Sequence, residues 1–227
     1  MTDVAPTRAP FLQNIPESIV AGLRSAGTRR RFPAGASVFF EGDEAHDALL
    51  LLEGTVKVTL TNLDGKEVIL DVLGGGSLVG ELSAIDGQCR SATATTLTPV
   101  EVLAVPCAAF IEVMHREPIL MYQLLVSVTG RLRASVRRQL EYGTSDALAR
   151  LCGRLMELAE QYGQPGVEGC INLESPVSQA DLAAWTGLSR EAVVKALRNL
   201  RAMGWIENQG RHITINRPDE LRRRSGT

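Results

Sequence analysis

Apolar residues recur in short runs through the first half of the chain, at alternate positions or in unbroken stretches such as Ala48–Leu52. Turns that contain glycine separate these runs. Several short runs at a spacing of about 8–12 residues are typical of an antiparallel sandwich or barrel. The pattern therefore predicts strands over 37–40, 48–52, 55–60, 67–72, 92–96 and 101–105, with a hairpin turn at 62–66.

The strands are preceded by a short lead-in, residues 1–31. It holds one small predicted helix, 16–23, and a basic segment, 28–31, that is expected to enter the sheet. The chain starts without the charged residues and apolar run of a signal peptide. Its longest apolar stretches are far too short to span a bilayer. We therefore expect a cytoplasmic protein.

After a short predicted helix at 108–114, the pattern predicts one long helix over 119–142, which Pro118 is well suited to start. A helix of about 24 residues spans about 36 Å, longer than a small sandwich covers. We therefore expect it to join two subunits through an apolar seam; the alternative is packing on its own domain. The seam stripe consists of Leu125, Val128, Leu132 and Ser135, with Leu124 and Leu140 near it and Arg131, Arg133, Arg137 and Arg138 facing elsewhere.

The long helix is expected to end at Gly143, and Asp146 to cap a further amphipathic helix over 147–163. We expect a domain boundary at residues 143–146. The predicted domains are 1–117, the antiparallel sandwich or barrel; 118–143, the long helix; and 144–227, a second globular domain.

The second domain contains two short helices separated by a tight turn. Ser178 and Asp181 form a capping box that opens helix 179–186, and Gly187 makes the turn. Ser189 caps a second helix, 190–203, and a small hairpin of 205–207 and 212–215 follows. This spacing is that of a helix-turn-helix with a β-wing.

The start of the second helix exposes Ser189, Arg190, Glu191 and Lys195. Such side chains suit a DNA major groove, because Arg bonds guanine bidentately and Glu accepts from cytosine. Lys195, one turn later, reaches another guanine or a phosphate. Ser178, Gln179 and Ser189, with the helix-terminal amides, are expected to hold phosphates. The alternative is a solvated ion pair on an ordinary surface helix.

A second cluster of candidate residues follows the glycines at 74–76. Gly80 enters a single helical turn, which leaves the N–H groups of Leu82, Ser83 and Ala84 pointing outward as a cradle for an anion. Arg90 supplies a charge that grips phosphate and Ser91 a hydroxyl. Glu81 is explained if the ligand also carries a ribose hydroxyl; the alternative for Glu81 and Arg90 is a surface ion pair.

The run G-E-L-S-A-I-D-G-Q-C-R-S-A-T, from Gly80, resembles the phosphate-binding cassette of the cyclic AMP receptor protein (CRP/FNR) superfamily. S-R-E-A-V-V-K-A-L, from Ser189, resembles its recognition helix. The resemblance extends from about Phe32 to Ile215. It implies an α+β fold: an N-terminal double-stranded β-helix (jelly-roll) that binds a cyclic nucleotide, a long dimerisation helix, and a C-terminal winged helix-turn-helix.

The resemblance also implies roles for single residues. Gly80 and the amides of its neighbours, Leu82 and Ser83 among them, would meet the cyclic phosphate, and Glu81 the ribose 2′-hydroxyl. Arg90 and Ser91 would clamp the phosphate. The remaining implied ligand-binding residues are Leu70 and Asp71, at the sheet side of the pocket, and Ser135 and Val136, late in the long helix.

The sequence departs from the family pattern at two positions. In cyclic AMP responders two polar residues of the long helix bond the adenine; Ser135 is able to do so, whereas Val136 is not. In the base-reading trio Arg190, Glu191 and Lys195, the lysine replaces an arginine and lacks its bidentate fork. The family pattern implies a palindromic operator resembling TGTGA-N6-TCACA, with half-sites about 34 Å apart.

Composition narrows the choice of function. The 227 residues carry 24 Lys plus Arg and 26 Asp plus Glu, a net charge of −2, which excludes a histone-like polycation but not a local basic face. The four cysteines form no C-x-x-C pair, so no zinc or iron–sulfur site is predicted. No nucleophile–base spacing suggests an enzyme. The basic tail, 217–224, is expected to be disordered; the alternative is a contact with DNA phosphates.

Three hypotheses follow. The first is a homodimeric transcription regulator, acting with RNA polymerase, whose operator affinity cyclic AMP controls allosterically. The second is a constitutive DNA-binding regulator of the same family, with an insensitive or differently occupied pocket. The third is a thiol redox sensor built on Cys89, whose neighbour Arg90 would lower the pKa of the thiol.

Overall fold

The computed structural model describes residues 11–226, and the first ten residues of the predicted lead-in lie outside it. By their internal contacts the residues form two compact units, one ending at Ser135 and the other starting at Val136. Within residues 11–226, no helix combines the length and the apolar character needed to cross a membrane.

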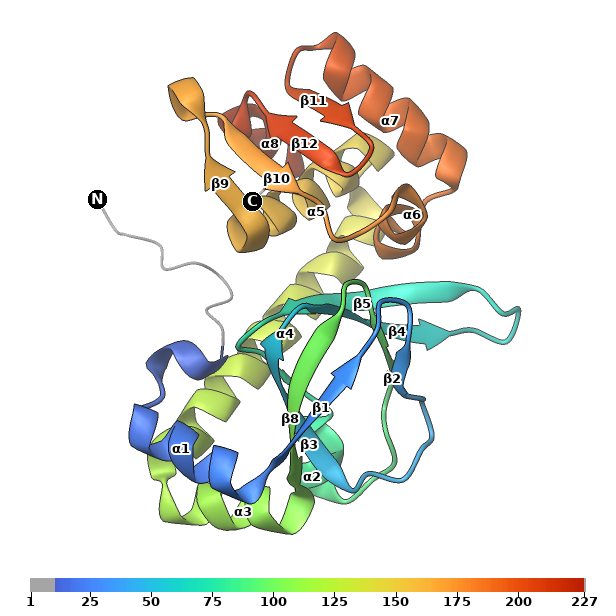
Figure 1. Cartoon of the computed structure of the whole chain (residues 1–227). Coiled ribbons are helices and arrows are strands. Elements are labelled where there is room, and N and C mark those ends of the chain that lie inside the picture. Colours follow the sequence, from blue (N-terminus) through green and yellow to red (C-terminus); the bar gives the residue numbers. More distant parts are fainter. Residues whose placement is uncertain (1–10, 227) are drawn as a thin grey trace. The chain divides into compact units, whose positions relative to one another are not determined.

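The first unit is a β-roll of two four-stranded antiparallel sheets, ordered β1-β8-β3-β6 and β2-β7-β4-β5 (Figure 1). All the predicted strands and the 62–66 hairpin are confirmed, whereas the two-residue strand β6 was not predicted from the sequence. The strands are β1 (Thr28–Phe32), β2 (Ser37–Phe39), β3 (Asp47–Glu53), β4 (Thr55–Thr61), β5 (Glu67–Gly74), β6 (Leu78–Val79), β7 (Thr93–Thr96) and β8 (Val100–Pro106).

Strand β3 contains an unbroken apolar run because both of its faces are buried. Leu49 and Leu51 belong to the cluster between the two sheets, with Val56 and Val102. Leu50 points the other way, into a second cluster formed with the helices. These helices are η1 (Phe11–Asn14), α1 (Glu17–Ala26), α2 (Glu81–Asp86), α3 (Cys107–Arg116) and the start of α4 (Pro118–Thr144).

The apolar positions of α4 divide between two environments. Leu124 is buried in the core of the first unit, and Val128 packs against the same cluster. Leu125 and Leu132, by contrast, are 60% and 62% exposed. The predicted single stripe is therefore two stripes, of which only one is left for a partner. Gly143 does not end the helix: α4 continues to Thr144, whose hydroxyl donates to the Leu140 carbonyl at 2.8 Å.

The second unit surrounds a sheet ordered β11-β12-β10-β9 with helices. The three predicted caps are confirmed, because Asp146, Ser178 and Ser189 each accept a hydrogen bond from the backbone N–H three residues on. Strands β9 and β10 were not predicted. The elements are α5 (Ala147–Tyr162), β9 (Gly163–Pro165), η2 (Val167–Gly169), β10 (Ile171–Glu174), α6 (Gln179–Thr186), α7 (Arg190–Ala202), β11 (Ile206–Gln209), β12 (His212–Ile215) and α8 (Pro218–Ser225).

The expectation of a disordered tail is wrong, because residues 218–225 form helix α8. Leu221 is fully buried, and α8 packs against α5. Its three arginines each contact an acid: Arg222 with Asp219, Arg223 with Glu220, and Arg224 with Asp146. One buried leucine and paired charges thus turn a polar tail into a docked helix.

Replacing Leu221 with alanine is expected to lower the unfolding free energy of the second unit by about 2–4 kcal/mol, because the change leaves a cavity under α8. Both tryptophans, Trp185 and Trp205, lie in this unit, so urea denaturation followed by tryptophan fluorescence measures its stability directly. Arg223→Ala, an exposed change on the same helix, is the control and should shift stability by less than about 0.5 kcal/mol. Equal stability of Leu221→Ala and wild type would contradict the docking of α8.

Candidate functional site

Gly80 occupies the left-handed region, with φ +73°, at the N-cap of α2. Its carbonyl accepts a hydrogen bond from Arg90 Nη1 at 2.8 Å. A Cβ atom at this position would lie 2.2 Å from the same nitrogen. The cassette therefore needs glycine here both for backbone conformation and for the close approach of the guanidinium.

Arg90 is buried, with 5% of its surface exposed. Its Nη2 donates to the Asp47 carbonyl at 2.8 Å and to Asp47 Oδ1 at 2.9 Å. The guanidinium carbon lies 4.4 Å from the centroid of the Phe39 ring. Arg90 Nε is buried and has no hydrogen-bond partner among the described residues. A buried, unsatisfied donor on a cation is costly, and an anionic ligand would remove this cost.

Asp47 reduces the positive charge of the cluster. Its second carboxylate oxygen lies 2.8 Å from Arg30 Nη1, so one carboxylate bridges two arginines. Asp47 was not predicted from the sequence, because it lies 43 residues before Arg90 and only the fold of β3 brings it there.

Glu81 is almost fully buried and accepts a hydrogen bond from Arg131 Nη1 at 2.9 Å. Arg131 also donates to the Leu78 carbonyl at 2.9 Å. Because Arg131 lies on α4, this ion pair joins the cassette to the long helix. A carboxylate accepts several hydrogen bonds, so the pair leaves capacity for a ligand hydroxyl.

The other predicted ligand residues are less closely gathered. Ser83 is buried and its hydroxyl donates to the Cys89 carbonyl at 3.1 Å, which closes the cassette on itself. Asp71 is buried and accepts from its neighbour's amide, Val72 N, at 2.9 Å. The side chains at the remaining predicted positions are exposed: Leu70, Leu82, Ser91, Ser135 and Val136. The structure thus brings Arg90 onto the Gly80 carbonyl, next in the chain to the buried Glu81.

Helix α7 presents the predicted polar surface. Arg190, Glu191 and Lys195 are exposed, and Val193, Ala196, Leu197 and Leu200 are buried as predicted, whereas Ala192 is only half-buried. The backbone and the Ser189 hydroxyl hold the pKa of Glu191 below its ordinary value. A carboxylate accepts hydrogen bonds, as recognition of a cytosine amino group requires.

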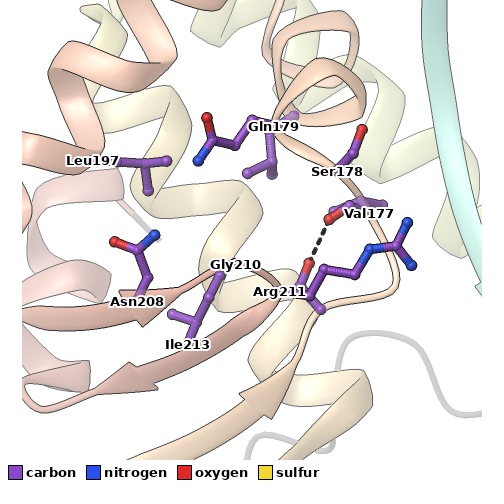
Figure 2. A pocket seen from close by; sticks show the side chains of 10 residues that line it. Val177, Ser178, Gln179, Leu197, Asn208, Gly210, Arg211 and Ile213 are labelled. Carbon is purple, nitrogen blue, oxygen red and sulfur yellow. Dashed lines mark hydrogen bonds between the residues drawn. The ribbon is translucent and has the colours of Figure 1, made fainter.

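A pocket of about 210 Å³ lies between α6, α7 and the β11–β12 wing. Figure 2 shows Gln179 of α6 and Asn208 of β11 directed toward it, beside the apolar Leu197 and Ile213. The Ser178 hydroxyl at its rim donates to Asp181 Oδ2 at 2.6 Å, so the capping box already uses this proton. Arg211, on the wing, is exposed and was not identified from the sequence.

The four cysteines are free thiols. Burial raises the pKa of Cys107 above its ordinary value and that of Cys152 to about 11, which keeps both protonated at neutral pH. The Cys89 thiol is exposed. Among residues 11–226, no group of three or more His, Cys, Asp or Glu side chains is arranged to hold a metal ion.

Two family models match the chain, one in each of its two units. Residues 29–117 match a cyclic nucleotide-binding domain, and residues 149–224 match a Crp-like helix-turn-helix domain. The two matches cover the cassette around Arg90 and the helix pair α6–α7, respectively.

Whole-length comparisons give regulators with different signals. The chain is 31% identical over 219 residues to the CRP-like cAMP-activated global transcriptional regulator of Mycobacterium tuberculosis, covering 96% of this chain and 97% of the relative. It is 28% identical to the global nitrogen regulator of Synechocystis, covering 84% and 85%. The structure of the c-di-GMP-responsive regulator CLP of Xanthomonas campestris shares the fold, with a TM-score of 0.75, 23% identity and coverage of 88% and 99%.

Proposed function

Since this chain belongs to the CRP/FNR superfamily of DNA-binding transcription regulators, we propose that it is a homodimeric regulator whose operator affinity is raised by cyclic AMP. The superfamily consists of regulators rather than enzymes, and the N-terminal domain is of the cyclic-nucleotide-binding type. The observation that carries the proposal is the buried Arg90, whose Nε lacks a partner beside Gly80 and Glu81.

The ion pair between Glu81 and Arg131 supports a route from ligand to dimer helix. A ribose hydroxyl that donates to Glu81 would change how this carboxylate bonds Arg131. It would thereby change how firmly the Arg131 side chain anchors α4 to the cassette. Coupling of this kind requires the nucleotide to bind the DNA-competent state more tightly than the other state.

The choice of cyclic AMP rests on side chains and on one relative. Ser135 offers a hydroxyl for an adenine amino group, and Ser91 a small hydroxyl for the phosphate. The M. tuberculosis relative is described as cAMP-activated, whereas the X. campestris regulator responds to c-di-GMP. Val136 offers no hydrogen bond, so we propose that this chain holds the base by fewer contacts than a typical responder.

Homodimerisation is proposed through α4. The described part of this helix leaves a stripe of large apolar side chains in solvent: Met121, Tyr122, Leu125, Leu132, Val136 and Leu140, exposed by 46–66%. A second copy of the same helix would cover them in a coiled-coil seam. We further propose three parts of the chain: domain 1–117, dimerisation helix 118–143 and domain 144–227. The proposed location is the cytoplasm, and the proposed partners are RNA polymerase and a palindromic operator resembling TGTGA-N6-TCACA.

A second candidate function is constitutive DNA binding. It is favoured by Asp47, whose carboxylate already supplies Arg90 with an anion from within the chain. In this alternative the internal ion pair stands in for the nucleotide phosphate, and the pocket is insensitive to cyclic AMP. No further observation favours the thiol sensor on Cys89, which stays a hypothesis.

Fluorescence anisotropy of a labelled TGTGA-N6-TCACA duplex at fixed salt tests the proposal. Saturating cyclic AMP is expected to tighten binding by at least about 10-fold, within the range usual for allosteric coupling. Tight binding that ignores the nucleotide would favour the constitutive alternative. Absence of binding in both conditions would contradict the proposed operator, and a scrambled duplex of the same length serves as the control for non-specific binding.

A further inference from the structure

The last turn of α4 is tied to α5 by a buried ion pair. Glu141 Oε2 lies 2.6 Å from Arg154 Nη2, and Arg154 Nη1 lies 2.7 Å from Glu157 Oε1. The Arg154 side chain is only 3% exposed, and its guanidinium lies over the ring of Trp185 at 5.7 Å. Arg154 therefore contacts both α4 and α6 from its place on α5.

The end of α6 receives two more side chains from the same region. The Tyr142 hydroxyl, also in the last turn of α4, lies 3.5 Å from the Trp185 carbonyl. Arg150 Nη1 donates to the Thr186 carbonyl at 3.0 Å and lies over the Tyr142 ring. These carbonyls belong to the last turn of a helix, where no intrahelical N–H is available to them.

The contacts continue into the turn of the helix-turn-helix. A Cβ atom at Gly187 would lie 3.2 Å from Tyr142 Cε1, so the tyrosine ring packs directly against the turn. Two residues later Ser189 caps α7, and the base-reading residues begin at Arg190. The turn that leads into α7 is therefore contacted by groups that also hold the end of α4.

We propose that Glu141, Tyr142, Arg150 and Arg154 act as a clamp that makes the last turn of α4 one rigid body with the helix-turn-helix. They are positioning residues for DNA binding, since none of them is among the base-reading side chains. Any change of direction between the earlier turns of α4 and α7 must then occur before Glu141, and not at the Gly143–Asp146 link. The inference rests on the DNA-binding function of the family. Only the measurements with and without cyclic AMP depend on the proposed effector.

A double-mutant cycle on operator affinity tests the clamp, with cyclic AMP present and the TGTGA-N6-TCACA duplex as probe. Arg154→Met is expected to weaken specific binding by at least about 10-fold, and Glu141→Gln by a few-fold. The double variant should be no weaker than Arg154→Met alone, because both changes break one contact. Binding to a scrambled duplex and cyclic AMP affinity should stay unchanged.

Arg222→Met is the matched control, because it removes an arginine from the surface of the same unit. Three results would each overturn the clamp. They are wild-type operator affinity in Arg154→Met, a loss of operator affinity in the double variant equal to the product of the two single losses, and an equal loss of affinity for the scrambled duplex. Tryptophan-monitored denaturation checks folding. If Arg154→Met fails to fold, Tyr142→Phe carries the test, since it removes one oxygen and should still cost a few-fold in operator affinity.

Hydrogen exchange of the full-length protein tests the clamp without an operator. Amides at 141–145 and 185–189 should be protected to a similar degree, with and without cyclic AMP, and Arg154→Met should accelerate both segments by about 10-fold or more. Rapid exchange of the last turn of α4 in the wild type, or a cyclic AMP-induced change confined to 143–146, would overturn the proposal. If the duplex fails to bind while these segments exchange together, the operator is wrong and the clamp stands.

Discussion

The Arg90→Met variant is expected to bind cyclic AMP at least about 100-fold more weakly than the wild type, as measured by isothermal titration calorimetry. Hydrogen bonds to charged groups contribute about 1.5–3 kcal/mol each, and a guanidinium offers the phosphate two of them. Because each 1.4 kcal/mol is about tenfold in affinity, losing both bonds costs about 100-fold or more. The nucleotide-dependent gain in operator binding should disappear with the affinity.

Arg90 also has structural contacts, and the experiment must separate them from ligand binding. Removing it leaves the Gly80 carbonyl unpaired, although Asp47 keeps its ion pair with Arg30. Arg90→Lys, which retains the charge but loses the fork, should give an intermediate affinity. Arg29→Met is the matched control, because that arginine is exposed and pairs with Glu101 on the neighbouring strand, away from Arg90 and Gly80. Unchanged affinity in folded Arg90→Met would remove the cassette as the effector site.

The elements predicted from the sequence are those that local patterns determine. A capping box at Ser178 and Asp181, a left-handed glycine at Gly187 and the unbroken apolar run of β3 each specify structure within a few residues. The exposed side chains of α7 followed from helical spacing in the same way. Local chemistry was therefore sufficient for the candidate DNA-reading surface.

The elements that were mispredicted depend on contacts far along the chain. Nothing local indicates that Arg131 meets Glu81, 50 residues before it. Gly143 is a plausible helix end by propensity, but the ion pair of Glu141 two residues earlier and the hydroxyl of Thr144 keep the last turn helical. Helix α8 has one buried leucine among charged residues. Packing against α5 therefore orders this helix, because its own sequence pattern is too weak to predict it.

Asp47 is the most consequential contact that the sequence did not reveal. It turns a predicted phosphate-gripping arginine into half of an internal ion pair. In the proposed site a nucleotide phosphate would reach the unpaired Nε of an arginine whose charge Asp47 already partly balances, so we expect nucleotide affinity to reflect Asp47 as much as the cassette motif. This is why the cassette predicts a phosphate site but leaves the strength of nucleotide binding to the fold.

The Arg190→Met variant is expected to lose specific operator binding by at least about 30-fold while its affinity for scrambled DNA falls only slightly. A bidentate contact to guanine is worth about 1–3 kcal/mol, and a dimer on a palindrome loses it twice. The anisotropy assay measures both affinities at one salt concentration. A proportional loss on operator and scrambled duplex would show that Arg190 contacts phosphate rather than a base.

Arg211→Met provides the contrasting variant, because Arg211 is an exposed cation on the wing rather than on α7. Neutralising a phosphate-contacting cation should weaken binding to all sequences alike and reduce the slope of log affinity against log salt by about one per contact. Arg190→Met should instead change the ratio of specific to non-specific binding.

Lys195→Arg is expected to sharpen discrimination at one base pair of each half-site. The guanidinium fork of arginine bonds a base in two places, whereas lysine lacks this fork and tolerates other base pairs more readily. If operators with all four base pairs at that position rank equally for Lys195 and for its arginine variant, the side chain at 195 reads no base.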